Sequence, residues 1–213
     1  MEYRRLQTGF YLPIRFGGPA TSRYLAALSP LVRFSIHYVL KEGMSFLDIG
    51  AGIGLASALA ARMPSVSITA IEPDDSMRIV LRTNLAFLRP AASAVLSPPV
   101  PSCGLRGSQD GLDPHEYIEF VKCAISSVSP DAIRLSGGHI DLFLPFVVAF
   151  SDACAVMIET DKRPSSTGSS QQAPLFPPNV WDIVFSTTWR SERRGPGRQE
   201  KFICVAKRRG RVR

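Results

Sequence analysis

The sequence predicts an α/β fold, with a mostly parallel β-sheet and helices on both of its faces. The first observation is a strand, a glycine turn, a helix and a second strand in residues 44–73. The second is that short β-branched runs keep alternating with helical patterns as far as residue 207, as expected of crossover connections. The third is a globular composition over 213 residues, with 45% hydrophobic and 20% charged residues. We therefore expect an N-terminal arm (1–30), one domain (31–208) and a basic tail (209–213).

The domain is predicted to be organised around residues 44–73. An apolar strand (44–49) ends near Asp48, and Gly50, Gly52 and Gly54 then alternate with small residues. Such a turn leaves backbone N–H groups uncovered at a helix start. Pro64 stops the helix, and a second strand (67–71) leads to Glu72, 24 positions after Asp48. This spacing is typical of a unit that brings the second strand back beside the first.

The glycine spacing separates two nucleotide ligands that such a unit can bind. A dinucleotide fingerprint requires G-x-G-x-x-G, but Leu55 occupies its sixth position here. A pyrophosphate would also be repelled by Asp48. S-adenosyl-L-methionine carries an ammonium and a cationic sulfonium, so a carboxylate beside the turn attracts it. The pattern favours this second ligand.

The remaining elements follow from apolar spacing and from breakers. Helices are expected at 30–40, 74–88, 116–128 and 140–150, and strands at 94–96, 133–135, 153–158, 181–189 and 201–207. Asp74 and Asp75 should accept the free N–H groups of the helix that they precede. Residues 1–20 are expected to form an irregular arm, and 101–114 and 162–178 to form loops. Residues 97–100, Ser-Pro-Pro-Val, are interpreted as a plain proline turn rather than an amine-binding loop, because they lack an aromatic residue and follow the third strand.

The turn and the acidic strand end resemble the first two motifs of class I S-adenosylmethionine-dependent methyltransferases. That resemblance implies a Rossmann-like seven-strand methyltransferase sheet whose last strand is antiparallel. Within this superfamily the chain is most similar to the FkbM-type methyltransferase group. The matching segments are Leu47-Asp48-Ile49-Gly50-Ala51-Gly52-Ile53-Gly54, Glu72-Pro73, Leu81-Arg82-Thr83-Asn84, Ile133-Arg134-Leu135-Ser136-Gly137-Gly138 and Ile158-Glu159. Ser136 and Gly138 replace acids of that group, which implies a different substrate or a reduced activity.

The predicted site combines cofactor-binding residues with one general base. Asp48 is expected to hold the methionine end of the cofactor, and Glu72 its ribose hydroxyls, while Asp74 or Asp75 borders the adenine. The full set of expected cofactor-binding residues is Asp48, Gly50, Ala51, Gly52, Gly54, Glu72, Pro73 and Asp74. His139, at the exit of the fourth strand, is the candidate base because imidazole titrates near neutrality. A noncatalytic histidine at a helix start is the competing interpretation, and no metal site is predicted.

Three functions are compatible with these patterns. The first is methylation of a small-molecule or sugar hydroxyl, which the FkbM resemblance implies. The second is RNA or protein methylation, because residues 190–213 hold ten Lys or Arg against two acids and could bind phosphates. A solvated hairpin is the competing interpretation of that cluster. The third is a methyltransferase-like domain with impaired catalysis. The sequence does not indicate the oligomeric state.

The cysteines and the apolar runs indicate the compartment. Cys103, Cys123, Cys154 and Cys204 are scattered, which predicts a reduced chain with ordinary buried thiols. No apolar run approaches the roughly 20 residues of a membrane span. We therefore expect a cytoplasmic protein, with an organelle transit peptide as the alternative that the arginine-rich N-terminus leaves open.

Overall fold

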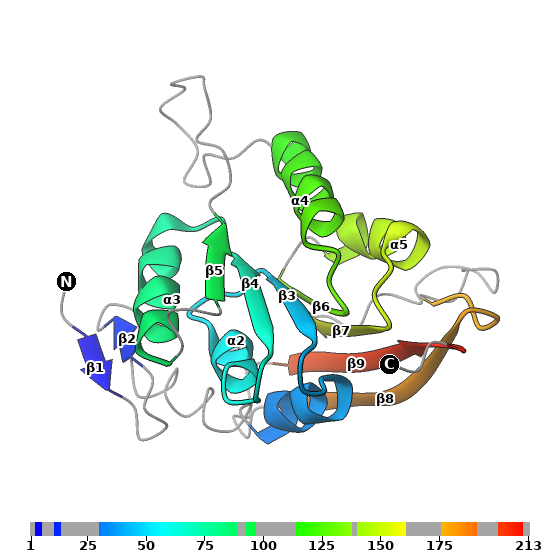
Figure 1. Cartoon of the computed structure of the whole chain (residues 1–213), viewed down its shortest axis with the longest axis horizontal. Coiled ribbons are helices and arrows are strands. Elements are labelled where there is room, and N and C mark those ends of the chain that lie inside the picture. Colours follow the sequence, from blue (N-terminus) through cyan, green and yellow to red (C-terminus); the bar gives the residue numbers. More distant parts are fainter. Residues whose placement is uncertain are drawn as a thin grey trace.

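The computed structural model describes residues 3–5, 11–13, 30–88, 93–96, 114–137, 140–160, 176–190 and 200–210. Its centre is a seven-stranded sheet with the strand order β5-β4-β3-β6-β7-β9-β8 (Figure 1). These strands are β3 (Ser45–Ile49), β4 (Ser67–Ile71), β5 (Ser93–Leu96), β6 (Ala132–Ser136), β7 (Ala155–Thr160), β8 (Trp181–Arg190) and β9 (Glu200–Arg208). Neighbours from β5 to β7 pair in parallel, whereas β9 runs antiparallel to both β7 and β8. The predicted fold class is confirmed.

Helices cover both faces of the sheet, as Figure 1 shows. The helix over residues 30–39, α2 (Leu55–Ala60) and α3 (Asp75–Leu88) pack on one face, against side chains such as Phe46, Ile68 and Ala70. On the other face, α4 (Pro114–Val128) and α5 (Ile140–Phe150) pack against Leu47, Ile133 and Val156. Both faces are buried because the parallel strands have apolar residues on each side. The carboxyl ends of β3, β4, β6 and β7 are left at one edge, where open α/β sheets place ligands.

Two expectations need correction. The N-terminal arm contains a short antiparallel pair, β1 (Tyr3–Arg5) and β2 (Tyr11–Pro13), and β2 lies beside α3 (Figure 1). Three-residue strands are too short to show a period-two pattern, so the sequence suggested only an irregular arm. Cys123 is exposed on α4, although Cys204 is buried as expected. In the described ranges, no helix is long and apolar enough to cross a membrane.

Candidate functional site

The glycine turn after β3 is held between the ends of β4 and β6. Gly50 and Ala51 both donate their backbone N–H to the carbonyl of Ile71, over 2.9 and 3.0 Å. Gly50 has a φ of +73°, and a Cβ at this position would lie 2.1 Å from the Ser136 carbonyl oxygen. Only glycine fits such a close backbone approach. The turn is therefore fixed by the backbone of two neighbouring strands.

Glu72, immediately after β4, binds across to this turn. Its Oε2 accepts the Gly52 N–H over 2.7 Å, and its Oε1 accepts the Asp74 N–H over 2.9 Å. The residue is only 7% exposed. Burial raises the pKa of the Glu72 carboxyl above its ordinary value, and the two backbone hydrogen bonds offset part of that rise. The predicted juxtaposition of the glycine turn and this carboxylate is present.

Asp74 begins the next helix rather than standing free. Its Oδ1 accepts the Met77 N–H over 2.8 Å and a bond from the Ser76 hydroxyl, which is the arrangement of an N-cap. Arg78, one turn into α3, donates to the carbonyls of Glu72 and Pro73 over 2.7 and 3.1 Å. These bonds fix the chain as it leaves β4. The capping role expected for Asp74 is confirmed.

Asp48 is completely buried at the base of the turn. Its Oδ1 accepts a bond from Arg134 Nη1 over 2.6 Å, and its Oδ2 accepts the Ser57 hydroxyl over 2.6 Å. Arg134 on β6 also donates to Glu159 Oε2 on β7 over 2.5 Å. Both oxygens of Asp48 are thus engaged within the protein. The charge of Asp48 still acts on the residues of the turn, because it contributes to the raised pKa of the Glu72 carboxyl.

α3 supports the turn from the side. Asn84 Nδ2 donates to the Ile53 carbonyl over 2.7 Å, and both residues are buried or nearly so. Leu81 packs so closely that a Cβ on Gly54 would lie 2.6 Å from its Cδ1. The Leu81 to Asn84 segment therefore has a physical role in fixing the glycine turn.

Some predicted positions fall outside the described residues. These are His139, Gly138 and the proline turn at 97–100. The predicted cofactor-binding residues, from Asp48 to Asp74, are all described and gather at the carboxyl ends of β3 and β4.

Three polar residues near the carboxyl ends of these strands were not predicted from the sequence. Arg134 is the one charged residue of the strand Ala132–Ser136, and a charge inside a buried strand can indicate a partner on a neighbouring strand. Ser57 lies in the small-residue helix α2 and gave no signal of its own. Tyr117 is buried on α4 with its ring edge-on to Phe143, and burial together with the nearby Glu72 raises the pKa of its hydroxyl.

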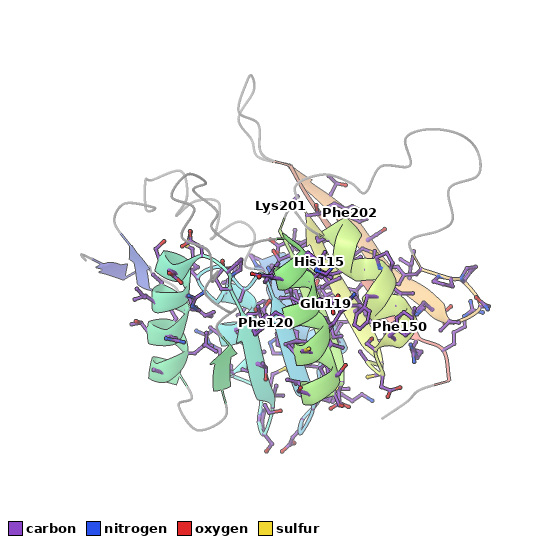
Figure 2. The ribbon with its side chains drawn as sticks, turned by 90° about the horizontal axis from the view of Figure 1, so that it is seen from above. His115, Glu119, Phe120, Phe150, Lys201 and Phe202 are labelled. Atoms are coloured by element: carbon purple, nitrogen blue, oxygen red, sulfur yellow. The ribbon has the colours of Figure 1, made fainter. Side chains whose placement is uncertain are left out.

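The structure describes the side chains of four basic residues of the C-terminal cluster, and all four make contacts within the fold. Lys201 Nζ lies 4.0 Å from Glu159 Oε1, and Lys207 Nζ lies 4.2 Å from the centre of the Tyr38 ring. Arg208 donates to Ser151 and Val148 carbonyls at the end of α5, and Arg209 pairs with Asp182. Figure 2 shows Lys201 at the start of β9 at the same end of the molecule as His115 at the start of α4. Each basic side chain of this cluster that the structure describes therefore has an intramolecular partner.

The fold is that of a Rossmann-like methyltransferase. It is defined by the strand order of the seven-stranded sheet, by the antiparallel direction of β9 within that sheet, and by the helices on both faces. No family model matches the chain, and no curated protein matches it in sequence. Solved structures do match. Precorrin-6y C5,15-methyltransferase from Geobacter metallireducens is 15% identical, with 94% of this chain and 93% of that chain covered and a TM-score of 0.56.

Two further structures are similar over most of the chain. An rRNA methylase from Streptococcus thermophilus is 12% identical, with 84% of this chain and 94% of that chain covered and a TM-score of 0.53. P. horikoshii TYW2, in complex with MeSAdo, is 15% identical, with 94% of this chain and 69% of that chain covered and a TM-score of 0.53. At these identities, the likeness establishes the fold and leaves the acceptor open.

Proposed function

We propose that the chain is a class I S-adenosyl-L-methionine-dependent methyltransferase. The observation that carries this proposal is Glu72, a buried carboxylate held at the glycine turn between two strand ends. Each oxygen of the Glu72 carboxylate accepts one backbone N–H and keeps a second lone pair, with which it can accept a ribose hydroxyl. The backbone is open at Gly52, where an added Cβ would meet nothing within 4 Å, so a nucleoside can approach it there. The fold supports the proposal because it belongs to the methyltransferase type.

We propose that most of the predicted cofactor-binding residues touch the ligand, and that Asp48 acts on it through its charge. Gly50, Ala51, Gly52 and Gly54 would form the surface against which the cofactor lies, with Glu72 on the ribose hydroxyls and Pro73 and Asp74 beside the adenine. Asp48 would favour the cationic methionine end through its charge, since its two oxygens are bonded to Arg134 and Ser57. When bound, the cofactor would supply an activated methyl group, so the task of the protein is to position the acceptor.

For the acceptor, we propose a hydroxyl of a small molecule or sugar, in line with the FkbM-type resemblance. His139 is the proposed base that removes the hydroxyl proton. The internal contacts of Lys207 and Arg208 support this choice over a nucleic acid, because these side chains already bind the Tyr38 ring and the carbonyls at the end of α5. Turnover with labelled cofactor on pooled small-molecule alcohols, compared with total RNA, tests the acceptor class. Methylation of RNA alone would overturn the acceptor proposal, and cofactor binding without turnover on either pool would support the impaired domain.

Calorimetry tests the cofactor site. Glu72→Gln keeps the shape but removes the negative charge, and we expect its affinity for S-adenosyl-L-methionine to fall by about 10- to 100-fold, the scale of hydrogen bonds to a charged group. Glu119→Gln is the matched control, because Glu119 is an exposed glutamate on α4 that pairs with Lys122. Its affinity should equal that of the unmodified protein. Equal affinity in both variants would remove the assignment of Glu72.

A further inference from the structure

Four charged side chains of alternating sign form a row across four neighbouring strands. Asp48 on β3 pairs with Arg134 on β6, Arg134 pairs with Glu159 on β7, and Glu159 lies 4.0 Å from Lys201 on β9. Side chains alternate along a strand, so residues two positions apart lie on the same face. Asp48, Arg134 and Glu159 each follow by two positions a residue of one apolar cluster, and Lys201 precedes by two positions another residue of it; these apolar residues are Phe46, Ala132, Met157 and Ile203. The row therefore continues the face that α2 and the helix over residues 30–39 cover, at the edge where the glycine turn lies.

Stabilisation of the fold is a poor explanation for the buried charge of Arg134, the second residue of the row. Arg134 is 5% exposed and both of its carboxylate partners are buried. Its Nε has no hydrogen-bond partner in the part of the chain that the structure describes. Taking three charges out of water is costly, and well-packed apolar residues often stabilise such a position as well or better. A positional role accounts for the arginine more readily than a stabilising one.

The contacts of Arg134 show what it positions. Through Asp48 it reaches Ser57 on α2, so one chain of hydrogen bonds connects β6, β3 and the helix that follows the glycine turn. Two residues further along β6, the carbonyl of Ser136 lies so close to Gly50 that it leaves no room for a side chain there. Glu159 supplies a second carboxylate that keeps the guanidinium in place. Burial alone would lower the pKa of Arg134, but the two carboxylates outweigh it and raise that pKa, so the guanidinium keeps its charge.

From this geometry we propose that Arg134 is a positioning residue of the cofactor site. It fixes the orientation of the Asp48 carboxylate at the base of the glycine turn, and it acts through Asp48 rather than by touching the ligand. This inference rests on the proposed function. It adds a residue whose role neither the glycine turn nor the acidic strand end indicated.

A mutant cycle with two ligands tests the proposal. The variants are Arg134→Met, Asp48→Asn and their combination, and the ligands are S-adenosyl-L-methionine and methylthioadenosine, which lacks the amino acid end. We expect Arg134→Met to weaken binding of the full cofactor by about tenfold or more, the scale of one buried charge contact. The combined variant should bind it as Asp48→Asn does, within about twofold, because Arg134 has no route to the ligand once Asp48 is neutral. Methylthioadenosine affinity should change less than about twofold throughout.

The controls separate this proposal from a structural role and from the cofactor assignment. Arg134→Lys keeps the charge and should restore part of the affinity, and Arg33→Met removes an exposed arginine of the helix over residues 30–39 and should change nothing. If Arg134→Met does not fold, the combined variant and Arg134→Lys carry the test, since neither leaves two buried carboxylates without a cation. Independent, additive losses, or equal losses for both ligands, would overturn the role of Arg134. Failure of the unmodified protein to bind either ligand would instead overturn the proposed function.

Discussion

At the scale of single residues, Gly50 and Gly52 have similar backbone conformations in different surroundings. Both have positive φ, at +73° and +58°, but an added Cβ would overlap the Ser136 carbonyl at Gly50 and would meet nothing within 4 Å at Gly52. Gly52→Ala should therefore cost about 1 kcal/mol of unfolding free energy, the conformational term alone. Gly50→Ala should cost roughly 1–3 kcal/mol more from overpacking against backbone. Urea unfolding of the two variants measures the difference, and equal losses would contradict the close approach of β6.

Glu72 gives a pH dependence whose sign follows from its environment. Burial raises the pKa of its carboxyl in the folded protein, and a protonated carboxyl is the weaker acceptor for ribose hydroxyls. Cofactor affinity should therefore be full above this raised pKa and should decrease as the pH falls through it, at a higher pH than an ordinary glutamate would require. Titrations between roughly pH 4 and 8 measure the decrease. Glu72→Gln should remove it, and a variant profile identical to that of the unmodified protein would exclude Glu72 as the titrating group.

At the scale of elements, β9 and α5 are joined by one arginine. Arg208 packs 5.0 Å over the Trp181 ring and donates to the Ser151 carbonyl over 3.0 Å, next to the C-terminal end of α5, where cations are favoured. Arg208→Met should cost about 1–3 kcal/mol because buried carbonyls lose their donor. Its neighbour Arg209 pairs with Asp182 in an exposed position, so Arg209→Met should cost about 0–1 kcal/mol. Thermal unfolding distinguishes them, and a larger loss in Arg209→Met would contradict this assignment.

At the scale of the whole molecule, the sequence predicted the contacts that form within one βαβ unit. The glycine spacing and Glu72 predicted the turn and its carboxylate because both belong to one βαβ unit. The pairing of Arg134 with Asp48 and with Glu159 was missed because these partners are 86 and 25 positions away in the sequence, and strand order alone brings them together. The N-terminal pairing of β1 with β2 was missed because three residues carry too little pattern. Local chemistry was thus predictable, whereas charge pairing across the sheet required the fold.

The glycine turn contacts β4, β6 and α3, so a ligand bound there should stabilise the domain as a unit. A ligand that binds the native state alone adds about 2.7 kcal/mol of stability at 100 times its Kd. For a domain of this size, that corresponds to a rise in Tm of roughly 5–11 °C. Thermal scans across a range of S-adenosyl-L-methionine concentrations should show this rise in a single transition, and Glu72→Gln should need about 10- to 100-fold more ligand for the same shift. An unchanged Tm at millimolar ligand, or a shift confined to part of the unfolding transition, would contradict a site built into the centre of the sheet.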